Sequence, residues 1–166
     1  GALRDAELAL RLAVSSLDAS ALHSSLRRTQ LAGPLRARLG LHRQFVEGEL
    51  RDAHFAIDGR IAVDPNQLVL EALRLAADDA QLLASGKVAL VDGSKFALRG
   101  SLQKFDPSRF ARLPAARLDA DFEAQGSRAP QLALSFRFQL HHSRLGSEAL
   151  SGNGEVELAG KRLRKA

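Results

Sequence analysis

Three short stretches of this sequence share a pattern that contains an aspartate, a residue type that can act as a general acid or base. They are LDASAL at 17–22, VDPNQL at 63–68 and FDPSRF at 105–110. None of these aspartates has a second ionisable residue at a spacing that suits a general acid and base. Helix capping explains them instead, because an Asp side chain accepts hydrogen bonds from the first N–H groups of a helical turn. Pro, which follows two of the three, is favoured at the first helical position.

We therefore expect Asp18, Asp64 and Asp106 to begin one-turn helical corners. The apolar residues at the two ends of each stretch occupy the positions of a hydrophobic staple. Leu17 is then expected to meet Leu22, and Phe105 to meet Phe110. In the middle stretch the residues LVLE follow at once, so a simple turn is expected there.

The histidines and glycines give no stronger sign of a catalytic or metal site. The five histidines are His23, His42, His54, His141 and His142. The last two are neighbours, and on a strand neighbouring side chains point to opposite sides. The glycines of LSGNGE alternate as in a strand and precede no helix that could cradle a phosphate. With no cysteine in the chain either, we expect no catalytic residue, no metal and no cofactor.

The charge distribution argues against a nucleic-acid partner. The net charge is +5, but the closing run KRLRK at 161–165 contains four of the basic residues, so residues 1–160 carry a net charge near +1. A nucleic-acid reader would show a basic stripe along a recognition element, and none is present. The basic run itself fits the polar side of one more strand, or a patch that binds an anionic membrane surface.

Apolar residues alternate with polar residues along most of the chain, which is typical of strands with one buried face. Clusters of Gly, Ser, Pro and Asp separate these runs, as in DGS at 92–94. The pattern predicts an all-β meander with short connections. The expected strands cover 6–14, 30–40, 54–63, 87–91, 95–102, 117–124, 131–141 and 149–160.

Residues 67–86 fit two interpretations. Leu68 and Leu70 share one parity and Leu73 and Leu75 the other, which indicates two strand pieces separated by a bulge or turn. Leu68, Leu75 and Leu82 lie seven apart in a segment rich in Ala and Leu, which favours a helix. We favour the strands because every neighbouring segment is a strand.

The strand rhythm and the corners together resemble the TamB family, the periplasm-spanning subunit of the translocation and assembly module within the AsmA-like group. GKVALVDGSKFALRGSLQKFDPSRF is similar to the repeating signature of that family, and SGNGEVELAGKRL resembles its strand–glycine–strand units. LDASAL followed by LAGPLRARLG fits the same scheme. The resemblance covers nearly all of the chain, although no catalytic motif anchors it.

The resemblance implies that residues 1–166 form a single β-sheet module from the interior of a longer chain. That chain would be anchored in the inner membrane of a Gram-negative bacterium and cross the periplasm toward an Omp85-type outer-membrane protein, TamA-like. The implied fold is a long curved antiparallel sheet, bent like a taco around an apolar groove. The implied roles are phospholipid transport between the two membranes and support of outer-membrane protein assembly, with no enzymatic activity.

The inward-facing apolar positions are the predicted lining of the groove, because acyl chains need an apolar surface with few directional contacts. The chosen residues are Leu98, Leu102, Leu118, Phe122, Leu132, Leu134, Phe136, Phe138 and Leu140. Period-two alternation suits a closed β-sandwich equally well. The alternatives are therefore a structural spacer, built as a sandwich or solenoid unit, and a chaperone that pairs its edge strands with outer-membrane protein clients.

Overall fold

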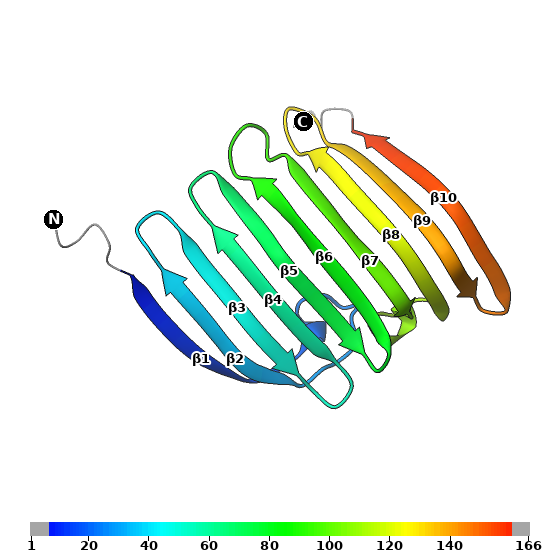
Figure 1. The fold of residues 1–166 in the computed structure, drawn as a ribbon, viewed down its shortest axis with the longest axis horizontal. Helices are drawn as coiled ribbons and strands as arrows, with labels where there is room; N and C mark the ends of the chain where they lie inside the picture. The colour runs from blue at the N-terminus through cyan, green and yellow to red at the C-terminus, as the bar shows by residue number, and fades with distance from the viewer. Residues whose placement is uncertain (1–6, 161–166) are drawn as a thin grey trace.

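The computed structural model describes residues 7–160, which form one sheet of 10 antiparallel strands (Figure 1). Each strand pairs with its neighbours in sequence, so the order across the sheet is β1 to β10. The strands are β1 Leu8–Leu17, β2 Leu31–Leu39, β3 Gln44–Arg51, β4 Ala56–Val63, β5 Gln67–Ala77, β6 Ala80–Ala89, β7 Phe96–Phe105, β8 Ala116–Ser127, β9 Ala133–Leu145 and β10 Glu148–Ala159. The prediction of an all-β meander is confirmed.

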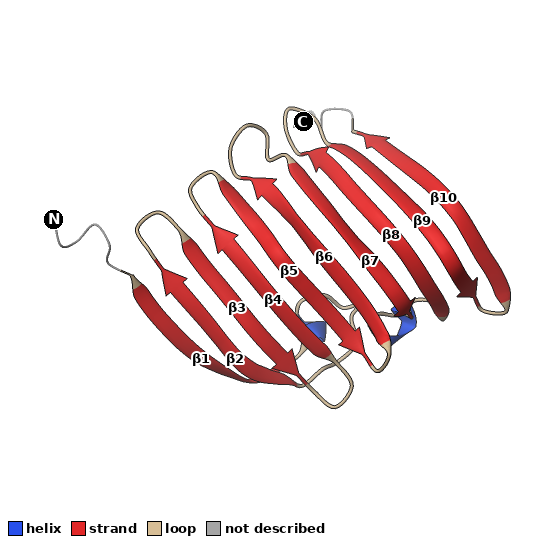
Figure 2. Ribbon diagram, in the orientation of Figure 1, coloured by secondary structure: helices blue, strands red, loops and turns tan. Residues whose placement is uncertain are grey.

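The described chain makes a single open sheet, not a closed sandwich. Its edges are β1 and β10, and no second sheet packs on it within residues 7–160. Between residues 7 and 160, helix is limited to two 3₁₀ turns, η1 Ala19–Ala21 and η2 Pro107–Arg109 (Figure 2). The register shifts in several strand pairs, and such bulges bend a strand. The outer strands curve along their length in Figure 1.

Residues 67–86 are two strands with a bulge, as the favoured interpretation predicted, and the helical alternative is wrong. The ladder between β5 and β6 pairs Leu70 with Gly86 and then Leu73 with Ala84. Two residues of β5 therefore lie opposite one residue of β6, which produces the parity change seen in the sequence. A turn at Asp78 and Asp79 joins the two strands.

One strand, β3, was missed by the sequence patterns. Its positions on the apolar side are Gln44, Val46, Gly48 and Leu50, and Phe45 lies on the opposite side. Gln44 and Gly48 on the apolar side, together with the aromatic Phe45 on the polar side, interrupt the alternation by which a strand is recognised in a sequence. The predicted basic tail lies outside the described residues. Between residues 7 and 160 no helix has both the length and the apolar character to cross a membrane.

Candidate functional site

Residues that pair across neighbouring strands lie on the same face of a sheet, so rows of paired residues can be followed from strand to strand. On one face these rows are apolar across all ten strands. We call this the apolar face and describe it by three rows that run from β1 to β10. The first row is Leu10, Ala37, Val46, Ile61, Leu70, Gly86, Leu98, Ala124, Phe136 and Val156. The second row is Leu12, Leu35, Gly48, Gly59, Leu73, Ala84, Gly100, Phe122, Phe138 and Gly154. The third row is Leu8, Leu39, Gln44, Val63, Leu68, Val88, Phe96, Gly126, Leu134 and Leu158.

The structure brings the predicted lining residues together on this face. Leu98 and Phe136 lie in the first row, Phe122 and Phe138 in the second, Leu134 in the third, and Leu102 and Leu140 both pair with Ala120 on either side of it. Leu118 pairs with Phe105 at one end of the same face. Leu132 precedes β9 and is exposed, and its carbonyl accepts a hydrogen bond from the Gly160 N–H.

Phenylalanine rings cover glycines of the next strand on the apolar face. A Cβ at Gly100 would lie 2.6 Å from Cζ of Phe122, and one at Gly154 would lie 2.5 Å from Cζ of Phe138. The centroid of the Phe136 ring lies 6.2 Å from that of Phe122 and 5.9 Å from that of Phe138. The missing side chains therefore leave room for rings to lie over the neighbouring strand, and together the rings form a continuous aromatic surface.

The two long connections of the chain meet at one end of the apolar face. We call these two segments, residues 18–30 and 106–115, the strap. Leu26 and Ala111 form an isolated antiparallel bridge, and the Arg27 N–H donates to the Phe110 carbonyl at 2.9 Å. Figure 2 shows both 3₁₀ turns at the same end of the sheet, behind it in this view.

Aromatic contacts place the strap against the apolar side of the sheet. Phe105 shares that side with Leu118 and stacks on Phe110 of the strap at a centroid distance of 4.9 Å. Phe110 also lies 5.2 Å from the Phe55 ring, which precedes β4. Leu31, at the start of β2 where the strap ends, is only 1% exposed. This end of the apolar face is thus covered, whereas the three rows are not.

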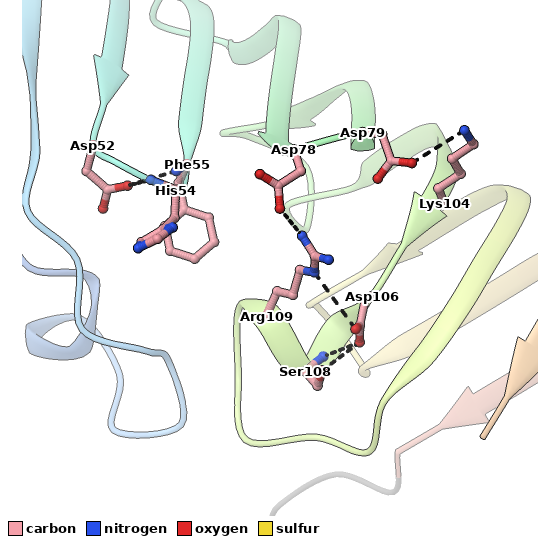
Figure 3. Close-up of polar contacts among 9 residues, drawn as sticks. All are labelled: Asp52, His54, Phe55, Asp78, Asp79, Lys104, Asp106, Ser108 and Arg109. Atoms are coloured by element: carbon pink, nitrogen blue, oxygen red, sulfur yellow. Dashed lines mark hydrogen bonds and ion pairs between the residues drawn. The ribbon is translucent and has the colours of Figure 1, made fainter.

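Ion pairs tie the strap to the turn between β5 and β6 (Figure 3). Arg109 donates to the Asp78 carboxylate, and its Nε lies 4.0 Å from Oδ2 of Asp106. Beside this pair, Nζ of Lys104 lies 3.4 Å from Oδ2 of Asp79. The side chains of Arg109, Asp78, Lys104 and Asp79 are substantially exposed, so these pairs add little to the stability of the fold, and the Arg109–Asp78 pair orients the strap.

The repeated aspartates are caps, as predicted. The Ser20 hydroxyl donates a hydrogen bond to the Asp18 carboxylate at 2.8 Å, and the Ser20 N–H donates a second one. The first of these bonds has the larger effect, and both hold the pKa of Asp18 below its ordinary value. Burial raises the pKa of Asp106, but hydrogen bonds from the Ser108 hydroxyl and from the N–H groups of Ala116 and Ser108 outweigh it, so that pKa is also lowered. Each carboxylate is held ionised by its turn, which is unsuited to proton transfer at neutral pH.

The two staples differ in the structure. The Phe105–Phe110 contact is present, but Leu22 is 74% exposed and so buries little surface against Leu17. The middle aspartate, Asp64, forms a turn without a helix and accepts from the Asn66 N–H at 2.8 Å, the bond that most lowers its pKa.

Asp52 is a fourth turn of the same kind that the sequence patterns missed. Its carboxylate accepts from the N–H groups of His54 and Phe55, both at 2.8 Å. The stretch RDAHF at 51–55 has Asp, one small residue and an aromatic three positions on. It lacks the apolar residue before the Asp, which is why the corner pattern did not reveal it.

The opposite face of the sheet is polar and contains the larger hollows. A hollow of about 830 Å³ crosses β5 to β10 on this face, between two rows of polar side chains. The polar residues include Arg99, Ser101, Asp121, Glu123, Arg137, Gln139, Asn153 and Glu155. Their charges alternate in sign across the strands, as where Nε of Arg137 lies 3.1 Å from Oε1 of Glu155. Alternating charge provides no focus for an ion of either sign.

The histidines are not brought together. His141 pairs with Asp121 on the polar face at 3.0 Å, and His23 contacts the Ser25 hydroxyl at 2.7 Å. Among residues 7–160 no group of three or more His, Asp or Glu side chains could hold a metal ion.

No family model, curated protein or solved structure matches this chain. The resemblance to the TamB family therefore stays a prediction from the sequence. The open sheet of antiparallel strands with one-turn corners agrees with the fold that this resemblance implies.

Proposed function

We propose that this chain is a TamB-like module whose apolar face shields lipid acyl chains during phospholipid transport between the inner and outer membranes. The observation that carries the proposal is the uncovered apolar face, whose three rows contain one polar side chain, Gln44, across ten strands. Proteins rarely leave a contiguous apolar surface of this extent open unless it binds something.

The composition of the face suits acyl chains. Leucine, valine, alanine and phenylalanine offer dispersion contacts without directional hydrogen bonds, and such contacts tolerate a ligand that slides. The strap covers one end of the face, so an acyl chain would lie across the strands along the three rows. Periplasmic location, an inner-membrane anchor and an Omp85-type partner belong to this proposal through the family resemblance.

A photo-crosslinking residue placed on each side of one strand tests the proposal. Phe136 lies in the first apolar row, and the next residue, Arg137, pairs with Glu155 on the polar face. With vesicles of bacterial phospholipid present, the crosslinker at 136 is expected to label lipid and the one at 137 is not. Equal labelling at the two positions would contradict the proposal. Absence of lipid at both, with a folded protein, would favour the spacer, and labelling of an added outer-membrane protein strand alone would favour the chaperone.

A further inference from the structure

A hollow of about 290 Å³ lies beside the strap, next to the turns that join β3 to β4 and β5 to β6. Its walls come from both segments of the strap and from these two turns, and the lining residues are Arg27, His54, Phe55, Ala77, Asp78, Ser108 and Arg109. Figure 3 shows His54 and Phe55 on one side of this space and Asp78 and Arg109 on the other. The three apolar rows contain none of these residues, so the hollow is separate from the open part of the apolar face.

The guanidinium group of Arg27 is held beside this hollow with hydrogen-bond donors to spare. Its Nε donates to the Ser108 carbonyl at 2.7 Å, a bond that joins the two segments of the strap and orients the planar group. Within residues 7–160 no carbonyl or carboxylate accepts a hydrogen bond from its two terminal nitrogens. An arginine oriented in this way offers the remaining N–H groups to an anion, and its fork of donors matches the oxygens of a carboxylate or a phosphate.

Two more side chains bring donors to the same hollow. Arg109 uses Nη1 for Asp78 and directs Nε toward Asp106, which leaves Nη2 without an acceptor in the described part of the chain. The centroid of the His54 ring lies 6.3 Å from that of Phe55, and its ring nitrogens have no hydrogen-bond partner between residues 7 and 160. A neutral imidazole supplies one N–H. Three side chains with spare donors therefore border a hollow that contains one carboxylate.

The rest of the lining is apolar and leads toward the apolar side of the sheet. Ala77 is only 2% exposed. Phe55 lines the hollow and also lies 5.2 Å from the ring of Phe110, which stacks on Phe105. Phe55 thus belongs both to the hollow and to the covered end of the apolar face, so a ligand held here would have polar donors on one side and apolar surface on the other.

We propose that this hollow binds the phosphate group of an anionic ligand through Arg27, with Arg109 and His54 as further donors. A phosphate accepts hydrogen bonds on several oxygens from several directions, which suits donors that come from separate connections of the chain. The volume lies just below the roughly 300–1,000 Å³ of sites for drug-sized ligands, so it accommodates a phosphate and a few attached atoms. A phospholipid headgroup and a soluble phosphate ester share this chemistry.

Asp78 sets the charge that an anion meets. The two arginines and this aspartate together leave one positive charge at the hollow. The Asp78 carboxylate also occupies Arg109, because the two side chains are paired. Removal of that negative charge should therefore strengthen phosphate binding, whereas removal of either arginine should weaken it.

Titration with inorganic phosphate, followed by ¹⁵N NMR of the arginine Nε–H groups, tests the site. The Arg27 signal is expected to shift, and Arg27→Gln is expected to weaken binding about tenfold. Arg28→Gln is the matched control. It removes the same charge from the neighbouring position, which does not line the hollow, so a change below about twofold is expected. No shift of the Arg27 signal, or an equal loss in the two variants, would overturn the proposal.

A second variant keeps the test valid if Arg27→Gln loosens the strap, since the Arg27 side chain joins its two segments. Asp78→Asn removes only an exposed ion pair and should leave the circular dichroism spectrum unchanged. It is expected to tighten phosphate binding about threefold. Binding that is unchanged or weaker in this variant would overturn the proposal.

Two further probes identify the source of the phosphate. Glycerol phosphate and dihexanoyl phosphatidylglycerol, used below its micelle concentration, are compared with inorganic phosphate. Tighter binding of the lipid with a shift of the Phe55 signals would support the site with a phospholipid headgroup as occupant, and equal binding of all three would support it with a soluble phosphate. Inorganic phosphate has no acyl chain, so failure of this site and failure of lipid labelling at position 136 are independent results.

Discussion

The rings of Phe105 and Phe110 stack with centroids 4.9 Å apart and planes 5° from parallel. Phe105 ends a strand of the sheet and Phe110 belongs to the strap, so this contact closes the corner that Asp106 begins. The strap is fixed to the apolar side of the sheet through this pair.

Phe110→Ala removes the ring that touches both Phe105 and Phe55, and we expect the free energy of unfolding to fall by about 2 kcal/mol. The estimate is below that for a fully buried ring because Phe110 is half-buried. Urea unfolding followed by circular dichroism measures the change. Leu22→Ala, at the equivalent position of the first corner, is the control. Its side chain is 74% exposed, so a loss below about 0.5 kcal/mol is expected. Equal losses would mean that the ring contact does not hold the strap.

The carboxylate of Asp106 should make the strap sensitive to acid. Its pKa in the folded protein is lowered from an ordinary value of 3.8, so its contribution is complete above that pH and is lost as pH falls through the folded pKa. Asp106→Ala should cost about 1 kcal/mol at pH 7 and progressively less below pH 4. Urea unfolding across this pH range checks it. A cost that does not change with pH would show that the charge of the cap is unimportant.

Two glycines of the second row should respond in opposite ways to alanine. A Cβ at Gly100 would lie 2.2 Å from the Leu83 carbonyl oxygen and 2.6 Å from Cζ of Phe122, whereas at Gly59 the nearest atom is Cδ1 of Leu73 at 3.7 Å. We expect Gly100→Ala to destabilise the protein by about 2 kcal/mol. Gly59→Ala should be neutral or stabilise it by about 0.5 kcal/mol, since alanine restricts the unfolded chain. Thermal unfolding of the pair compares them, and similar melting temperatures would contradict the ring-over-glycine packing.

Phe136→Asp separates an open apolar face from a closed core. The side chain is half-buried and no second sheet formed by the described residues covers it, so the carboxylate can reach water and the strand should stay folded. In a closed core an unpaired charge would unfold the domain. We expect a native circular dichroism spectrum together with loss of phospholipid that is extractable from the purified protein. Gln125→Asp, which faces Ala97 and Ser135 on the polar side, should keep both the spectrum and the lipid. Retention of lipid by the Phe136 variant would contradict the proposed site.

The alternation of residue types was sufficient to predict most strands and the face of most side chains. Leu134, Phe136 and Phe138 share a face because a strand has a period of two, and no tertiary information is needed to see it. The corners at Asp18 and Asp106 were equally local, since a cap and its turn lie within a few residues. Strand β3 was missed because Gln44, Phe45 and Gly48 are each of the wrong type for their side of the sheet.

The strap could not be predicted from local patterns. Leu26 and Ala111 are far apart in sequence and neither has a residue type that names its partner. The choice between an open sheet and a sandwich was equally hidden, because both present one apolar side per strand. An open sheet forms when each strand pairs with the next one along the whole chain, as it does here, whereas a sandwich forms when the strands divide into two sheets. The pairing of the strands therefore decides between the two folds, and the alternation of residue types does not specify that pairing.

The strap has a consequence for how the molecule folds and withstands force. In the part of the chain that the structure describes, every ladder joins strands adjacent in sequence, so hairpins can add one after another like the units of a repeat protein. Such a zipper would melt from either end in small steps. The bridge from Leu26 to Ala111 joins the β1–β2 connection to the β7–β8 connection across this series, so the intervening strands form a closed loop of chain. That loop must open before those strands can peel away singly, which makes the middle of the sheet one cooperative unit.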